Sequence, residues 1–200
     1  YIYLDTDERR RFAQVSHEYL IEQLQFTGDE SVTANATTKN IDLSFNHPVK
    51  ELVWICKNTG VTVEPSSHSL LAADVLMATR DNLAGRTAGA TIGSPSAGPL
   101  TSAKLQLNGH DRFATRDAGY FNLVQPKNHH TCIPSSRGIY VYSFALKPED
   151  HQPSGTCNFS RIDNAKLSLV LSGDSAGVIK VFAVNYNVLR IMSGMGGLAY

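Results

Sequence analysis

The stretch GIYVYSFALKPEDHQPSGTCNFSRID (residues 138–163) is the part of this sequence that decides the fold class. It opens with an apolar run, Ile139 to Leu146, which predicts a β-strand. A turn-rich segment follows, with Pro148, Pro153 and Gly155 at positions that constrain the chain path. The stretch contains no nucleophile–base pair, no metal-ligand spacing and no phosphate-binding loop. It therefore indicates architecture, not chemistry.

Strand-like patterns recur on both sides of this stretch. Residues 40–45, 104–108 and 166–171 alternate between apolar and polar side chains, which predicts strands with one buried and one polar face. Leu52 to Cys56 and Val178 to Ile191, like Ile139 to Leu146, are apolar on both faces, so we expect all three in central positions that are covered on both sides. Seven or eight strands separated by turns predict an all-β sandwich or barrel.

Helical patterns are few. Asp5 with Glu8 resembles a capping box, and apolar residues at helical spacing then predict a helix over Thr6 to Ser16. We expect a strand over Tyr19 to Phe26. A second short helix is predicted over Thr115 to Val124, ended by Pro126.

Two segments lie outside these patterns. Asn58 to Pro99 is rich in Ser, Thr, Ala and Gly and is long for a connection in one domain, so we expect a loop excursion, with a short helix over Leu70 to Thr79. The glycine-rich end, Ser193 to Tyr200, predicts an extended tail.

Composition limits the function classes. The 200 residues include 18 basic and 18 acidic side chains, which gives a formal net charge of zero. The one basic run, Arg9 to Arg11, lies close to three acidic residues, so direct nucleic-acid binding is not expected. No run reaches the ~20 apolar residues of a membrane-spanning helix. Cys56, Cys132 and Cys157 are too few and too widely spaced for a disulfide framework, and we expect free thiols.

The candidate chemical motifs favour structural roles. His129-His130-x-Cys132 lacks the paired ligand spacings of structural zinc, and no His-x-His pair of the cupin type occurs, so we expect no metal, cofactor or catalytic residue. Two segments fit the N-glycosylation sequon, Asn35-Ala-Thr and Asn158-Phe-Ser. Asn35 is the candidate acceptor because its surroundings are polar, whereas Asn158 lies inside the turn-rich segment.

Five segments together resemble the major capsid proteins of large icosahedral DNA viruses, such as iridoviruses and phycodnaviruses. They cover about half of the chain in the family's order and are YIYLDTDERRRFA (1–13), HEYLIEQ (17–23), LQLNGHDRF (105–113), residues 138–163 and VNYNVLRIMSGMGGLAY (184–200).

The resemblance implies a fold and a function. Proteins of this family are similar to two successive eight-stranded jelly rolls in one polypeptide, and three copies form a pseudo-hexagonal trimer that tiles an icosahedral shell. This chain resembles the second, C-terminal jelly roll, with the first expected before Tyr1. We therefore expect residues 1–200 to form a single domain, an all-β, eight-stranded antiparallel jelly-roll sandwich with one or two short helices and a long excursion over about 58–99.

The same resemblance sets the expected partners and location. The partners would be other copies of the chain in a homotrimer, neighbouring capsomers and minor capsid proteins. The protein would reside in the virion shell and, during assembly, in the host cytoplasm. Separately from the resemblance, long loops at one end of a sandwich can project outward, so we expect Asn58 to Pro99 or the Thr27 to Thr38 turn to contribute to contacts between subunits or to the outer tower.

Two other classes remain open, because a fold alone does not decide function. One is a jelly-roll glycan-binding or attachment module, which would bind glycans in isolation. The other is a cupin-like enzyme, which would contain stoichiometric metal.

Overall fold

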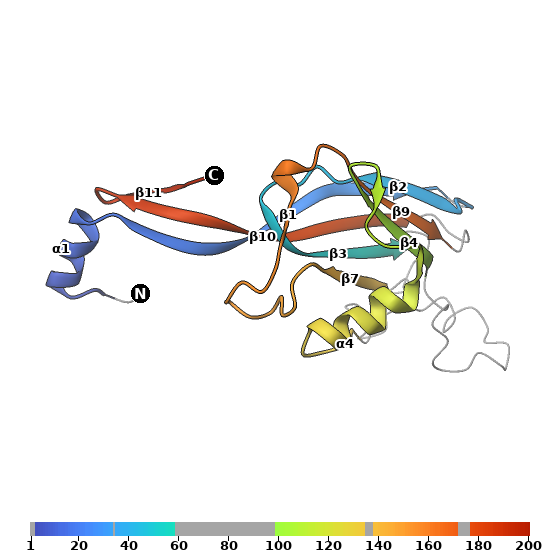
Figure 1. Ribbon diagram of the computed structural model, residues 1–200, viewed down its shortest axis with the longest axis horizontal. Helices are drawn as coiled ribbons and strands as arrows, with labels where there is room; N and C mark the ends of the chain where they lie inside the picture. The colour runs from blue at the N-terminus through green and yellow to red at the C-terminus, as the bar shows by residue number, and fades with distance from the viewer. Residues whose placement is uncertain (1–2, 34, 59–98, 135–137, 172–176) are drawn as a thin grey trace, which may run out of the picture.

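Two antiparallel β-sheets packed face to face form the body of the molecule (Figure 1). The computed structural model describes residues 3–33, 35–58, 99–134, 138–171 and 177–200. The first sheet has the strand order β1-β10-β3-β7, with β11 paired to β10 and β8 paired to β3. Its strands are β1 (His17–Val32), β3 (Pro48–Asn58), β7 (Ile139–Ser143), β8 (Cys157–Asn158), β10 (Gly177–Met192) and β11 (Met195–Leu198).

The second sheet has the order β2-β9-β4-β5, with the short β6 paired to β4. Its strands are β2 (Thr38–Asp42), β4 (Leu100–Leu107), β5 (His110–Asp111), β6 (Arg116–Asp117) and β9 (Ala165–Leu171). Four strands along the main path of each sheet make the eight-stranded antiparallel sandwich that the sequence predicts. The fold class is confirmed, and the alternating segments 40–45, 104–108 and 166–171 contribute β2, β4 and β9.

The core lies between the two sheets and is built by the period-two pattern. Leu52, Trp54 and Cys56 of β3 alternate inward and are at most 1% exposed. Leu167 and Leu169 of β9 face them from the second sheet and are 1% exposed. Trp54 is the largest fully buried side chain, and its ring lies 5.1 Å from that of Phe121 and 5.9 Å from that of Tyr140. Such aromatic contacts add to the free energy of area burial.

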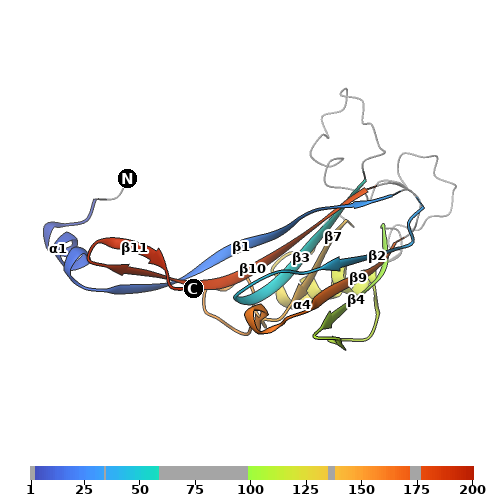
Figure 2. The same cartoon turned by 90° about the horizontal axis from the view of Figure 1, so that it is seen from above.

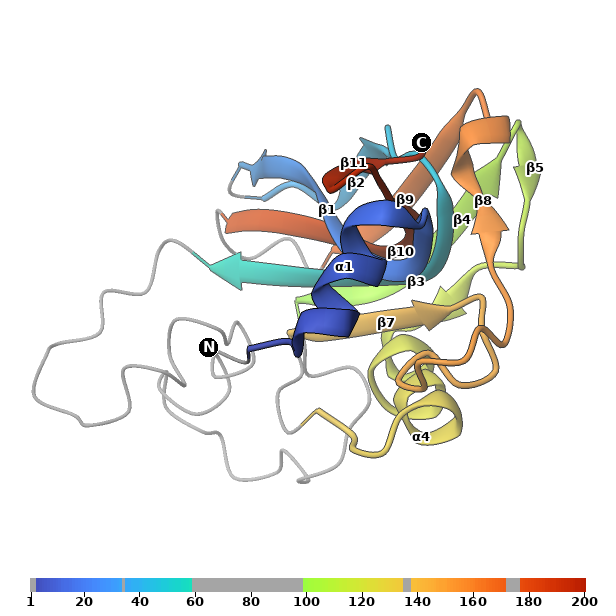
Figure 3. The same cartoon turned by 90° about the vertical axis from the view of Figure 1, so that its left-hand side faces the viewer.

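A helical stretch over residues 118–129 covers the end of the core beside β7 (Figure 3). After two helical residues, 118–119, it consists of the π-helical turn η2 (Tyr120–Val124) and α4 (Gln125–His129), with Phe121 fully buried. The expectation that Pro126 ends this helix is wrong. The Gln125 amide donates to the Tyr120 carbonyl five residues earlier. This wider turn lets a residue that lacks an N–H group follow without ending the helix.

The strand β7 lies at the end of the first sheet, not in the centre as its apolar sequence led us to expect. Its side chains are nevertheless largely buried. The helix supplies the missing partners: Asn122 Nδ2 donates to the Ile139 carbonyl at 2.8 Å, and the Ser143 amide donates to Gln125 Oε1 at 3.0 Å. An edge strand is thus covered by helix side chains, which protects it from pairing with another chain.

The N-terminal helix α1 (Thr6–Gln14) agrees with prediction within two residues. Its N-cap is Asp5, whose carboxylate accepts from the Thr6 amide at 2.7 Å. The strand that follows is longer than the predicted Tyr19 to Phe26, because β1 pairs with β10 along almost its whole length.

The C-terminus is a hairpin, and the expectation of an extended tail is wrong. Met192 pairs with Met195 across a two-residue turn in which Ser193 and Gly194 have φ of 52° and 76°. Positive φ at both turn residues gives the turn a twist that matches the right-handed twist of the two strands. Glycine adopts positive φ without a steric cost. The strand β11 thereby adds to the outer end of β10.

The two longest strands extend beyond the sandwich (Figures 1 and 2). The pairing of β10 with β3 ends at Asn185, so the segments beyond that point pair only with each other and with β11. We call residues 3–22 and 186–200 together the arm. It carries α1 and β11 at its far end.

The excursion over Asn58 to Pro99 and its expected helix over Leu70 to Thr79 fall almost wholly outside the described residues. Within the described ranges, no helix has the length and apolar character that a membrane crossing requires.

Candidate structural site: the strand–knot–strand segment

The segment 138–163 begins with β7, which pairs with β3, and continues past Lys50 to the first residues of β3. We call its central loop, residues 144–156, the knot. The amides of Phe144 and Ala145 both donate to the Lys50 carbonyl, at 2.9 and 3.2 Å. After the knot, β8 pairs with the beginning of β3 through Cys157 and Asn158. The knot is therefore anchored to β3 at both ends.

Hydrogen bonds close the knot from within. Ser154 Oγ accepts from the Lys147 amide at 2.9 Å and donates to the Lys147 carbonyl at 3.2 Å. Pro148 is buried, and Gly155 has φ of 144°, which side chains other than glycine rarely allow. A Cβ at Gly155 would lie 2.9 Å from the Phe144 carbonyl oxygen. The prediction that turn residues fix the path of this loop is confirmed at Gly155, whereas Pro153 is exposed.

A short 3-10 helix, η3 (Phe159–Arg161), completes the segment. Asn158 caps it, because its side-chain oxygen accepts from the Ser160 amide at 3.1 Å. The ring of Phe159 is buried 6.0 Å from those of Phe45 and Phe144. The second half of the segment is thus pinned to the core by one aromatic side chain.

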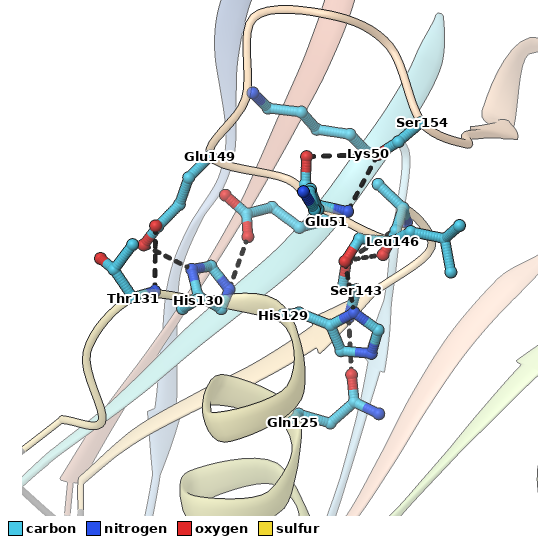
Figure 4. Close-up of polar contacts among 12 residues, drawn as sticks. Lys50, Glu51, Gln125, His129, His130, Thr131, Ser143, Leu146, Glu149 and Ser154 are labelled. Atoms are coloured by element: carbon cyan, nitrogen blue, oxygen red, sulfur yellow. Dashed lines mark hydrogen bonds and ion pairs between the residues drawn. The ribbon is translucent and has the colours of Figure 1, made fainter.

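An ionic cluster joins the helix, β3 and the knot (Figure 4). His130, at the end of α4, lies with Nε2 3.1 Å from Glu51 Oε2 and with Nδ1 3.2 Å from Glu149 Oε1. The Nε2 contact is not aligned for a straight hydrogen bond, and it is an ion pair when His130 is protonated. Glu149 also accepts from the Thr131 amide at 3.0 Å. One imidazole therefore links three segments that are far apart in the sequence.

The electrostatics favour the charged form of His130. Contact with the Glu51 carboxylate raises the pKa of His130, against the opposing effect of burial, and Glu149 adds to the rise. Hydrogen bonding to Thr131 lowers the pKa of Glu149, and His130 contributes in the same direction. The cluster therefore links the helix to the sheet through an interaction that weakens when His130 loses its proton.

The His129-His130-x-Cys132 motif does not converge on one point. His129 Nδ1 lies 2.9 Å from the Leu146 carbonyl oxygen, and Cys132 is exposed. The two glutamates contact opposite nitrogens of the His130 ring, so they do not face a common centre. Among the described residues, no three His, Cys, Asp or Glu side chains are placed to hold a metal ion.

The three cysteines are free thiols. Burial raises the pKa of Cys56 to about 12 and also raises the pKa of Cys157. The buried Cys56 and the half-buried Cys157 are therefore poor nucleophiles, because the reactive thiolate form is disfavoured.

Sequence reasoning missed the partners of His130 and the role of Gln125. The one available signal was Lys50-Glu51, a charged pair inside the apolar run 49–56. Both side chains prove to be buried and paired: Lys50 Nζ lies 2.6 Å from Glu22 Oε1, and Glu51 meets His130. Burying a charged side chain costs free energy unless an opposite charge or hydrogen bonds pair with it, and both of these are paired.

The comparisons with known proteins agree with this architecture. The family model described as "Large eukaryotic DNA virus major capsid protein" matches residues 8–197. The major capsid protein of Pyramimonas orientalis virus is 52% identical over 222 residues, covering 100% of this chain and 47% of that protein. The major capsid protein of Paramecium bursaria Chlorella virus 1 is 48% identical over 241 residues, covering 100% of this chain and 52% of that protein.

A solved structure gives the same result. The chain superposes on PBCV-1 VP54, from a crystal structure fitted into a cryo-EM reconstruction of the virophage Sputnik, with a TM-score of 0.77 and 46% identity. The match covers 100% of this chain and 55% of that one. The chain thus spans about half the length of the relatives it matches, and over that span it belongs to the family of large eukaryotic DNA virus major capsid proteins.

Proposed function

We propose that the full-length protein is the structural subunit of an icosahedral virus capsid, that it forms pseudo-hexagonal homotrimers which tile the shell, and that it performs no catalysis. The observation that carries the proposal is the family match over residues 8–197 together with the jelly-roll sandwich. Residues 1–200 form one domain of that subunit. The partners are further copies, neighbouring capsomers and minor capsid proteins, in the virion and, during assembly, in the host cytoplasm.

The knot suits such a role. A shell subunit is repeated many times, so each copy must present the same surface, and a loop fixed by Gly155, Ser154 and the His130 cluster has little freedom to vary. The sandwich also carries apolar side chains on an outer face. Leu24 is 65% exposed, and Phe26 is 46% exposed and stacks on Phe182 at 4.8 Å. Aromatic and aliphatic surfaces are what repeated subunit contacts bury.

Electron microscopy of the purified full-length protein tests the proposal. Trimers with a hexagonal outline, or shell fragments built from them, are the expected result. Persistent monomers with a bound glycan, or stoichiometric metal in the purified protein, would contradict it and favour the attachment module or the enzyme respectively.

We further propose that Asn35 is the N-glycan acceptor when the protein is made in a host that glycosylates it. Asn35 is exposed in the turn between β1 and β2, with φ of 66°. At the other sequon, the Asn158 oxygen caps η3 and the Ser160 hydroxyl accepts from the His47 amide at 2.8 Å. Mass spectrometry of glycosylated protein should lose the sugar mass in Asn35→Gln and keep it in Asn158→Gln. Sugar that persists in Asn35→Gln would refute the assignment.

A further inference from the structure

The arm has almost no core of its own. Its helix, α1, has nine residues and none of them is buried. Beyond the sandwich, β1 and β10 form a narrow ribbon that β11 widens at its outer end. A short helix and a two- or three-stranded ribbon do not hold their structure in water unless they pack against something. The arm therefore requires a cover that the described residues do not provide.

The surface of the arm is apolar enough to be covered. Sixteen large apolar side chains are exposed among the described residues, and nine of them lie in the arm. They come from both ends of the chain and are Tyr3, Leu4, Val15, Tyr19, Leu20, Met192, Met195, Leu198 and Tyr200. Met195 is 75% exposed and Tyr200 is 81% exposed. Isolated apolar side chains on a surface need no explanation, but a concentration of this kind marks a contact surface.

A hollow of about 400 Å³ lies where the arm joins the sandwich. Leu20, Tyr186, Val188 and Tyr200 line it from the arm, and His47 and Pro48 line it from the sandwich. Asn158, Ser160 and Asn187 add polar groups to the lining, so the hollow can accept both apolar and polar side chains.

The connectivity of the chain identifies the cover. The first and last described residues, Tyr3 and Tyr200, both belong to the arm (Figure 1). The matched relatives are about twice as long as this chain, which covers 47% and 52% of two of them. Additional chain joined at either end would emerge beside the arm, and a tethered segment is present at a far higher effective concentration than a second molecule. The arm also needs its cover in order to fold, before any contact between copies can form.

We propose that the arm is the docking surface between the two halves of the full-length protein: the remaining half packs on the apolar side chains of the arm and fills the hollow at Leu20 and Tyr186. This inference goes beyond the proposed shell function. It holds or fails whether or not the protein forms trimers.

Photocrosslinking in the full-length gene product tests the docking surface. A benzophenone amino acid replaces Met195 in the arm and, as the matched control, Leu146 in the knot, which is 72% exposed. We expect the Met195 probe to crosslink within one polypeptide, at several times the yield of the control. The product should migrate as a monomer on a denaturing gel, and its peptides should join position 195 to residues outside this 200-residue segment.

The other outcomes overturn the inference. Crosslinked bands of twice the monomer mass would show that a second copy covers the arm. A crosslink yield no higher than that of the Leu146 control would show that nothing covers it. A gene product limited to these 200 residues would lack the proposed partner altogether. Light scattering on the same sample reports trimer formation separately. Trimers without the intrachain crosslink would reject the docking surface and keep the shell function, and the reverse combination would do the opposite.

Discussion

Replacing Gly155 by alanine tests whether the geometry of the knot is as tightly constrained as the structure indicates. The glycine has φ of 144°, and an added Cβ would lie 2.9 Å from the Phe144 carbonyl oxygen and 3.4 Å from the Ala145 Cα. These are backbone atoms, and the amides of the same two residues are bonded to the Lys50 carbonyl. The clash cannot be relieved by rotating a side chain, so the knot must shift or detach from β3.

The magnitude follows from two costs and one gain. A non-glycine residue in this region of φ costs about 1–3 kcal/mol. Displacing the anchored backbone adds about 1 kcal/mol for a weakened hydrogen bond. Alanine also lowers the conformational entropy of the unfolded chain, which stabilises the folded state by about 0.4–1 kcal/mol. We expect a net loss of about 2–3 kcal/mol, which lowers the Tm of a chain this size by roughly 4–12 °C.

The assay is thermal unfolding of the purified variants followed by circular dichroism, with Gly109→Ala as the control. Gly109 also has a positive φ, 80°, but a Cβ there would meet nothing within 4 Å. It shows the cost of a positive-φ backbone without a clash, about 1–2 kcal/mol. If Gly155→Ala lowers the Tm no more than Gly109→Ala does, the knot is not held against Phe144 and the reasoning is refuted.

Three further predictions concern the ion pair of His130 with β3, the hydrogen bond between Gln125 and β7, and the buried thiol of β3. Glu51 raises the pKa of His130 from its ordinary value of 6.5, so the stability that protonated His130 contributes is complete below about pH 6.5 and is lost as the pH rises through the pKa of the folded state. The Tm difference between wild type and His130→Gln should therefore shrink from pH 6 to pH 9. A constant difference would contradict the ion pair. Gln125→Ala leaves the buried Ser143 amide without its acceptor and should cost about 1–3 kcal/mol in urea unfolding, whereas the exposed Lys127→Ala should change little; equal effects would show that the contact is not stabilising. Iodoacetamide at pH 8 should modify Cys132 in the native protein and reach Cys56 only after unfolding, because the pKa of Cys56 is about 12; rapid native labelling of Cys56 would show that β3 opens.

Local patterns were sufficient for much of the fold. The period-two alternation in 166–171 predicts β9, and Asp5 predicts the start of α1, because strand faces and helix caps depend on residues within a few positions of each other. Turn residues predicted the knot in the same way, since the φ of Gly155 is a local requirement. Free cysteines followed from number and spacing.

The candidate site could be predicted only in part. His130 was visible as one of a pair of histidines, but its partners Glu51 and Glu149 lie 79 positions before it and 19 after it. No local spacing encodes such a contact, because it depends on where the helix is placed against β3. The sequence also could not show that Pro126 continues a helix, since that depends on the π-helical turn before it.

By itself, then, the sequence determined the all-β class, the turn chemistry of residues 138–163 and the resemblance to the capsid family, because each rests on short-range patterns of residue type. Tertiary structure alone decided that β7 is an edge strand covered by the helix, that Ser193 to Tyr200 turns back on β10, and that β1 and β10 extend beyond the sandwich as the arm. Those features depend on which strands pair and where the pairing stops. Strand pairing joins residues more than 150 positions apart, such as Leu20 and Val188, so its extent is set by the packing of the whole chain.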